Sequence, residues 1–448
     1  MTLLFKVLYR CYRFASRRWH WAQRRFTPAG LGVLGAFILV VLLAPDTDNN
    51  LTYQALPLLL VLLVTAVCLS RPFKAPFSAC RVLPRVGTVG CPLSYHVVVR
   101  NLSRRGQNGL SLLENLADPW PSFKEWLAAQ RAEQKVLRSF RFSGRRPLNP
   151  FKVAVAKDAP VPTMAPGQEV EVRMELTPLR RGILRFTGAT LAHPDPFGLF
   201  RALTLVPLPQ TVLILPKRYL LPAVALPGTA KYQEGGVALA ASVGQSEEYV
   251  ALRDYRHGDP LRHIHWRSWA RVGRPVVKEF EDEFFVRHAL VLDTFTDDAP
   301  SEVFEEAVSV AASFACTLPT QESLLDLLFV GPQSYCFTAG RGVAHVEQML
   351  EILASVRACS DQPFRALEHL VLGHVEAVSG CICVLVAWDE ARREFIRKLK
   401  ALGVPVLILV IVPPGETRKP ELGPLNDEPD RFLVLEAGKI ESGLAKLK

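Results

Sequence analysis

The residue types best suited to chemistry are concentrated between residues 248 and 278. Seven Lys or Arg side chains lie from Arg253 to Lys278, and Asp254 and Asp259 are interspersed among them. A guanidinium is a planar fork that holds carboxylates or phosphates bidentately. Three interpretations follow: a buried Arg–carboxylate lattice that pins two domains together, a surface that docks an acidic partner, or a site for nucleic acid or another phosphate ligand. We favour the lattice and regard nucleic acid as the weakest of the three.

Two aromatic and two imidazole side chains lie inside the same stretch. Trp266 and Trp269 would serve as apolar anchors or lie beneath guanidinium groups. His263 and His265 are two residues apart, hence on one face of an extended chain, where a metal pair is conceivable. The neighbouring sequence offers no third ligand, so the pattern favours hydrogen-bonded structural histidines.

The spacing of this stretch resembles a bacterial family called domain of unknown function 58. The family signature is roughly E-[FY]-x-x-L-R-x-Y-x-x-G-D-x-x-R-x-I-x-W-[KR]-x-x-A-R. The sequence departs from it at His257, where Pro is usual, and at His265, where Asp is usual. Upstream, an Arg-Arg-Gly element at residues 180–182 and Asp-Pro-Phe-Gly-Leu-Phe at residues 195–200 also resemble the family. The matching positions are Glu248, Tyr249, Leu252, Arg253, Tyr255, Gly258, Asp259, Arg262, Ile264, Trp266, Arg267, Ala270 and Arg271.

The resemblance implies a von Willebrand factor A-like domain downstream and frequent genetic pairing with a MoxR-type AAA+ ATPase. Such domains carry a metal-ion-dependent adhesion site with the pattern Asp-x-Ser-x-Ser after the first strand. Asp293 matches the first position, whereas Phe295 and Asp297 replace the two serines. Asp389 follows a later strand and could complete a degenerate Mg²⁺ site, since Mg²⁺ prefers oxygen ligands. The alternative, which we favour, is that Asp293 caps the end of a strand and no cofactor binds.

The elements that must position these residues form an alternating series in residues 286–448. Apolar runs at 286–293, 324–330, 381–387 and 404–412 predict strands, with a short edge strand at 334–338. Apolar residues recur with helical spacing in 301–317, 345–358, 364–375 and 390–402, which predicts helices there. Such alternation is typical of a doubly wound α/β sheet with ligands at the carboxyl ends of the strands. Because the sequence has no Gly-x-Gly-x-x-Gly, P-loop, His-Glu-x-x-His or Gly-x-Ser-x-Gly motif, it predicts no catalytic residue and no enzyme.

Residues 80–215 show short alternating apolar runs separated by turn residues, which predicts an antiparallel β-sandwich-like domain. A helical stretch at 122–138 leads into Arg141, Arg145 and Arg146, and this basic insert could bind a partner or be a solvated helix. Residues 216–247 are rich in Pro, Gly and Ala and predict a linker to the Arg/Trp motif at 248–285.

The first 70 residues predict a membrane anchor. Residues 1–28 hold seven Lys or Arg and no acid, and the apolar runs 29–44 and 51–69 flank a loop that contains Asp46 and Asp48. We expect a transmembrane helical hairpin at 29–70, with both ends cytoplasmic by the positive-inside rule. A buried soluble hairpin is the alternative. Nine cysteines without a disulfide framework suit a reducing compartment.

The expected protein is thus a multi-pass inner-membrane scaffold or adaptor that contacts the lipid bilayer and works with a MoxR-type AAA+ ATPase in protein assembly or maturation. Two alternatives stay open. One is a divalent-metal-dependent enzyme or ligand-binding domain that uses Asp293, Asp297 and Asp389. The other is an anion or nucleic-acid binder that uses the arginine motif.

Overall fold

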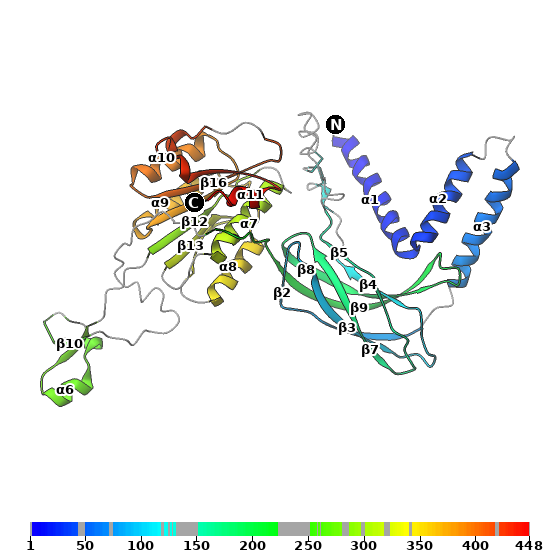
Figure 1. Ribbon diagram of the computed structural model, residues 1–448, viewed down its shortest axis with the longest axis horizontal. Helices are drawn as coiled ribbons and strands as arrows, with labels where there is room; N and C mark the ends of the chain where they lie inside the picture. The colour runs from blue at the N-terminus through cyan, green and yellow to red at the C-terminus, as the bar shows by residue number, and fades with distance from the viewer. Residues whose placement is uncertain are drawn as a thin grey trace. The chain divides into compact units, whose positions relative to one another are not determined.

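The computed structural model describes residues 2–43, 50–70, 75–117, 121–123, 126–127, 129–130, 151–222, 251–257, 259, 261–279, 286–296, 301–317, 323–339, 343–416 and 421–447 (Figure 1). The described chain forms two compact units, one of residues 1–217 and one that starts at residue 218. Of the basic insert predicted near residues 122–146, residues 124–125, 128 and 131–146 lie outside the described residues. The same holds for linker residues 223–247 and for motif residues 248–250, which include Glu248 and Tyr249.

The first unit begins with three helices: α1 (Thr2–Arg25), α2 (Pro28–Leu43) and α3 (Asn50–Ser70). Helices α2 and α3 lie side by side (Figure 1). Near their base, Ala66 of α3 clusters with Leu199 and Phe200 of the β-domain. Gly30 permits a close approach there, because a Cβ at this position would come within 1.9 Å of the carbonyl oxygen of Leu199.

The prediction of a membrane-spanning hairpin, and with it of a multi-pass inner-membrane location, is wrong: within the described ranges no helix combines the length and the apolar character that a bilayer crossing needs. Helix α2 has 16 residues. At ~1.5 Å per residue it rises ~24 Å, short of the ~30 Å hydrocarbon core. Helix α3 is longer, but its apolar stretch lies between Gln54 and Ser70 and rises only ~22 Å. The fold class is therefore corrected to a β-rich domain and an α/β domain without such a hairpin.

Two sheets make up the rest of the first unit. One has the order β1-β3-β7-β5 and the other the order β2-β9-β8-β4-β6. Neighbouring strands are antiparallel except β2 and β9, which are parallel. The bounds are β1 (Phe77–Val82), β2 (Val86–Thr88), β3 (Leu93–Asn101), β4 (Ser111–Leu116), β5 (Ala154–Ala156), β6 (Ala159–Pro160), β7 (Glu169–Pro178), β8 (Gly182–Pro194) and β9 (Arg201–Leu215).

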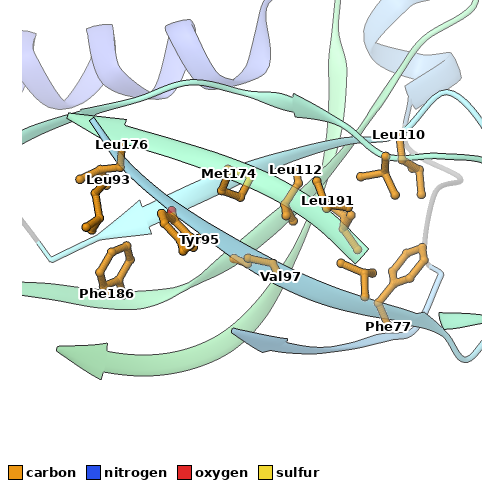
Figure 2. Packing of buried hydrophobic residues seen from close by; sticks show 14 of the residues in the cluster. Phe77, Leu93, Tyr95, Val97, Leu110, Leu112, Met174, Leu176, Phe186 and Leu191 are labelled. Atoms are coloured by element: carbon orange, nitrogen blue, oxygen red, sulfur yellow. The ribbon is translucent and has the colours of Figure 1, made fainter. Parts of the chain in front are cut away.

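The core of this β-domain lies between the two sheets, because alternate residues of each strand point inward. Strand β3 buries every second residue, including Tyr95 and Val97 (Figure 2). From the other sheet, Leu112, Phe186 and Leu191 join the same cluster (Figure 2). This inter-sheet core thus holds the two sheets of the β-domain together.

A charged pair is also buried in this domain. Arg81 of β1 donates from Nη2 to Oε2 of Glu114 on β4 at 2.6 Å, and both side chains are fully shielded from solvent. Arg81 also donates to the carbonyls of Leu208 and Gly188 at 3.1 Å. These bonds satisfy most of the guanidinium's donors, which a buried charge requires.

The second unit contains a small module built on a hairpin of β10 (Ala251–Asp254) and β11 (Val276–Glu279), which are antiparallel. The connection carries a 3₁₀ turn, η1 (Leu261–His263), and helix α6 (Trp266–Val272). Gly273 ends α6 with φ 73°, the left-handed conformation that glycine adopts readily. Ile264 and Val277 are buried and form a β-bridge, which ties the connection to the hairpin.

The remainder of the second unit is a six-stranded sheet of order β14-β13-β12-β15-β16-β17, parallel except for β14. The strands are β12 (Val286–Leu292), β13 (Ser323–Val330), β14 (Ser334–Ala339), β15 (Gly380–Leu385), β16 (Val406–Val412) and β17 (Phe432–Glu436). The helices are α7 (Glu302–Thr317), α8 (Val343–Ser355), α9 (Arg365–Leu372), α10 (Glu390–Ala401) and α11 (Ile440–Leu444), with short 3₁₀ turns η2 (Val375–Ala377), η3 (Gly423–Leu425) and η4 (Pro429–Arg431).

Strand order places a topological switch point between β12 and β15. The chain leaves β12 toward β13 on one side and returns to β15 on the other side. In open parallel sheets, ligands bind outside the carboxyl ends of the strands at such a point. The residues that follow β12 and β15 are therefore the first place to look for a functional site.

Candidate functional site

Asp293 immediately follows β12 at the switch point and is completely buried. Its Oδ1 accepts a hydrogen bond from the backbone N–H of Phe295 at 3.0 Å. Its Oδ2 accepts from the backbone N–H of Val386, just beyond β15, at 3.2 Å. The carboxylate thus joins the ends of two neighbouring strands, as expected for an acid that caps a strand.

The guanidinium of Arg392 lies against this carboxylate. From α10, Arg392 donates from Nε to Oδ2 of Asp293 at 2.6 Å and from Nη1 to Oδ2 of Asp389 at 2.6 Å. Its Nη2 donates to the carbonyl of Phe295 at 3.1 Å, and its Cζ lies 4.8 Å from the ring centroid of Phe364. An internal cation therefore lies between the two carboxylates, where a metal ion would lie in the less favoured of the two sequence interpretations.

Asp389 positions Arg392 through the start of α10. As the N-cap residue, Asp389 accepts from the backbone N–H of Arg392 at 3.0 Å through Oδ1, while Oδ2 holds the guanidinium. An N-cap carboxylate satisfies an orphan amide and also interacts favourably with the helix dipole. The same side chain thus starts the helix and directs Arg392 toward Asp293.

The electrostatics of the centre reflect this arrangement. Burial raises the pKa of Asp293, and the charge of Arg392 and the two backbone N–H groups oppose that rise. Burial lowers the pKa of Arg392, but the Asp293 and Asp389 carboxylates outweigh it and raise the pKa above the ordinary value. The guanidinium is therefore a permanent positive charge at the centre.

The third predicted metal ligand, Asp297, lies outside the described residues. In the part of the chain that the structure describes, no group of three or more His, Cys, Asp or Glu side chains is arranged to hold a metal ion. Asp293 and Asp389 are brought together as the sequence suggested, but each already has a charged hydrogen-bond partner in Arg392.

The Arg/Trp module holds one well-formed pair of the kind that the predicted lattice required. Arg253 on β10 donates from Nη1 and Nη2 to the two carboxylate oxygens of Asp259, at 2.7 and 2.8 Å. The backbone N–H of Arg256 also donates to Asp259 at 2.8 Å. The hydrogen bonds from Arg253 and from this amide lower the pKa of Asp259 to about 2. This fork closes the loop that follows β10, and Tyr255 in that loop donates its backbone N–H to the carbonyl of Pro275 at 3.0 Å.

The other motif arginines are exposed. Arg262, Arg267 and Arg271 have solvent-exposed side chains, and no carboxylate of the described residues lies within ion-pair distance of them. Trp266 is 64% exposed, and its ring stacks on that of Trp269 with centroids 5.2 Å apart. Most of these motif side chains therefore lie on the surface of the module and do not form a buried lattice. Gly258 lies outside the described residues.

The two histidines take part in local hydrogen bonds. His265 Nδ1 and the hydroxyl of Ser268 are 2.6 Å apart, and Arg262 Nε donates to Nε2 of His263 at 3.3 Å. The rings are thus engaged within the module, as structural histidines are.

Residues 251–431, which contain the module and most of the α/β domain, match the family model described as "Protein of unknown function DUF58". Residues 251–431 therefore belong to the DUF58 family. Among curated proteins, the chain is similar to the uncharacterized protein YeaD of Bacillus subtilis (strain 168), with 27% identity over 203 residues, 44% of this chain. The chain spans about half the length of that relative, 49%.

Solved structures offer only weak likenesses to the chain. The CARDB domain of a Pyrococcus furiosus protein has 15% identity and a TM-score of 0.17, over 31% of this chain and 94% of that domain. A cohesin module from a Clostridium perfringens family 33 glycoside hydrolase has 12% identity and a TM-score of 0.16, over 32% of this chain and 98% of that module. Likenesses at this level add nothing to the description of the site.

The Asp-Pro-Phe-Gly-Leu-Phe element forms a turn, as its Asp-Pro and Gly residues indicate. The sequence does not show that Asp195 organises this turn, with its carboxylate accepting from the amides of Phe197, Leu199 and Phe200 at 3.0, 2.7 and 2.6 Å. A structural residue that the sequence interpretation missed is Arg392, whose only sequence signal is its position three residues after Asp389. That spacing places both side chains on the first turn of a helix.

Proposed function

We propose that this chain is a non-catalytic adaptor that docks a MoxR-type AAA+ ATPase through the exposed face of the Arg/Trp module. We call this the basic–aromatic face and define it by Arg256, Arg262, Trp266, Arg267 and Arg271. The observation that carries the proposal is that these side chains are exposed on a small, internally bonded module.

Charge supports an acidic partner. Residues 251–278 contain seven Lys or Arg and two Asp. Both Asp are already paired within the module, Asp259 with Arg253 and Asp254 with Arg274 at 3.0 Å. Arg267 and Arg271 are four residues apart on α6, where like charges repel each other. An acidic partner surface would relieve this repulsion and add charge-assisted hydrogen bonds.

Apolar exposure favours a protein over a nucleic acid as that partner. Beside the arginines, Leu252, Leu261 and Val272 are 41%, 68% and 53% exposed. Aliphatic side chains gain from burial against another apolar surface, whereas a phosphate backbone offers them none. Exposed Trp and Arg are also the side chains that most often dominate the energetics of protein interfaces.

The centre around Asp293 supports the non-catalytic part of the proposal. A carboxylate that would ligate a cation or move a proton has to be available to it. Asp293 is buried and is hydrogen-bonded by Arg392 at 2.6 Å and by two backbone amides. The side chain of Arg392 thus fills the edge of the sheet where a ligand would otherwise bind.

The test measures binding of the full chain to the purified ATPase of the same organism by biolayer interferometry. We expect Arg267→Gln with Arg271→Gln to weaken the complex about tenfold or more, or ~1.4 kcal/mol per tenfold. The matched control is Arg104→Gln with Arg105→Gln, which removes the same charge from exposed positions of the β-domain and should leave the affinity within twofold.

The proposal fails if the unmodified chain does not bind the ATPase, or if the control pair weakens binding as much as the α6 pair. It also fails if the α6 pair abolishes binding to a single-stranded oligonucleotide with a steep salt dependence while the ATPase affinity is unchanged, since that pattern identifies nucleic acid as the ligand.

A further inference from the structure

A cavity of about 320 Å³ lies in the first unit between α1 and the β-domain. Five of its lining residues come from α1: Arg17, His20, Trp21, Arg24 and Arg25. Their spacing of three, four, seven and eight residues from Arg17 places them on one face of the helix. The cavity is therefore the space that the basic face of α1 encloses with the sheet.

Arg24 is one of two half-buried arginines among these residues. Its Nη2 donates to Oδ1 of Asn115 on β4. The same Oδ1 accepts from the hydroxyl of Thr190 on β8 at 2.9 Å. Two neutral polar groups of the sheet thus fix the position of the guanidinium without neutralising its charge.

The two acidic side chains whose charges act on Arg24 form ion pairs with other arginines. Burial lowers the pKa of Arg24, and the more distant charges of Asp158 and Glu114 only partly oppose that effect. Glu114 is held by Arg81 at 2.6 Å, and Asp158 by Arg201 at 2.8 Å. No acidic side chain lines the cavity within the described ranges. The cavity consequently carries a net positive charge that is partly withdrawn from solvent.

Part of the lining is apolar. Trp21, on the same face of α1 as the arginines, packs edge-on against Phe26 with ring centroids 6.3 Å apart, and Leu203 and Leu205 line the cavity from β9. The Cζ of Arg25 lies 5.8 Å from the ring centroid of Phe200. The cavity thus combines cationic and apolar lining side chains.

We propose that this cavity binds a phosphate monoester that carries an apolar group. Several cations facing one space match a dianion better than a single carboxylate, and the guanidinium fork fits phosphate oxygens bidentately. The volume is in the range of small-molecule sites, ~300–1,000 Å³. A soluble phosphomonoester and a phosphatidic acid headgroup share this chemistry. The site is independent of the Arg/Trp module and of the adaptor role.

The experiment is isothermal titration calorimetry on the full chain with phenyl phosphate, inorganic phosphate and dihexanoyl phosphatidic acid below its micelle concentration. We expect saturable binding of phenyl phosphate, with inorganic phosphate at least tenfold weaker because it makes no contact with Trp21, Leu203 and Leu205. Tighter binding of the phosphatidic acid than of phenyl phosphate would identify a lipid phosphate, and the reverse order a soluble ester. Both orders support the site.

Two variants locate the binding. Arg24→Gln keeps a donor for Asn115 but removes the charge, and Arg17→Gln removes a charge at an exposed position. Each should weaken phenyl phosphate binding about tenfold. The matched control is Arg13→Gln, an exposed arginine of the same helix that does not line the cavity, and it should change the affinity by less than twofold.

Absence of saturable binding to all three phosphates overturns the proposal. So does an equal loss in the Arg13 variant, because general attraction to a basic helix then explains the signal. Equal affinity for inorganic and phenyl phosphate also overturns it, since the apolar lining side chains then contribute nothing to binding.

Discussion

Replacing Arg392 by Met tests the central electrostatic feature of the α/β domain. Methionine keeps most of the apolar stem but removes the charge and all donors. The change takes away the bonds to Asp293 and Asp389, both at 2.6 Å, and the bond to the carbonyl of Phe295 at 3.1 Å. Asp293, which has no exposed surface, is left as a buried carboxylate held only by two backbone amides.

The expected loss is ~3–5 kcal/mol of unfolding free energy, the range found when one partner of a buried ion pair is removed. At ~2–4 °C per kcal/mol for a domain of this class, the thermal midpoint should fall by roughly 6–20 °C. The control is Arg397→Met on the same helix. The Arg397 pairs with Glu390 and Glu394 are exposed, so the loss there should be far smaller than that for Arg392→Met.

The loss should also depend on pH. Burial already raises the pKa of Asp293 above 3.8, and removing Arg392 raises it further. Between the unfolded and the folded pKa, the folded state binds more protons than the unfolded state, so its stability increases as the pH falls. This pH range is wider in the Arg392→Met variant, because its folded-state pKa for Asp293 is higher. The difference between the two proteins is therefore greatest at neutral pH and decreases on acidification toward pH ~4.

The assay is denaturant unfolding of the full chain, with hydrogen exchange of peptides from β12 and β15 to assign the change to this domain. The double variant Asp293→Asn, Arg392→Met should be more stable than Arg392→Met alone, since no unpaired charge remains. A loss below ~1 kcal/mol, independent of pH from 4 to 8, would show that Arg392 does not neutralise a buried carboxylate.

Two further predictions concern the other bonded arginines. Arg81→Met should lower the unfolding free energy of the β-domain by ~3–5 kcal/mol, because it leaves the buried Glu114 carboxylate without its charged partner. Lys157→Met removes an exposed pair and should cost less than ~1 kcal/mol. Urea denaturation measures both losses, and equal losses would contradict the burial of the Arg81–Glu114 pair. The pKa of Asp259 is lowered to about 2, so its stabilisation of the module is present above pH ~4 and is lost as the pH falls toward 2. The protection factor of the Arg256 amide should follow that loss and should be low at all pH values in Asp259→Ala, which has no side-chain acceptor; an unchanged protection factor would rule out the hydrogen bond.

Local patterning predicted the α/β domain well because each of its buried strands is a short apolar run. The expected strand at 404–412 is β16, which begins two residues later, at Val406. Strand β17 was missed because it follows a segment rich in Pro, Gly and Asp that reads as a tail. The N-terminal prediction failed for the opposite reason. Apolar composition alone does not establish a spanning helix, because length decides whether a helix can cross a bilayer.

Part of the candidate site could likewise be predicted from the sequence and part could not. That Asp293 and Asp389 meet could be predicted, because residues after parallel strands gather at one edge of a sheet. The guanidinium between them could not, since a residue in the first turn of a helix points inward or outward according to packing. Nor does the sequence show which arginines of the Arg/Trp motif are exposed, because pairing depends on whether a carboxylate reaches them in three dimensions.

The division between paired and unpaired arginines is what separates structural from binding roles in this chain. A buried guanidinium must be neutralised and hydrogen-bonded, so a facing carboxylate identifies it as part of the fold. An exposed guanidinium without such a partner contributes little to stability and keeps its donors available for a ligand. Substitutions of the buried, paired arginines should therefore reduce stability, whereas substitutions of the exposed arginines without a facing carboxylate should reduce affinity for a ligand. The buried pairs are Arg81–Glu114, Arg287–Asp326 and Arg392–Asp293.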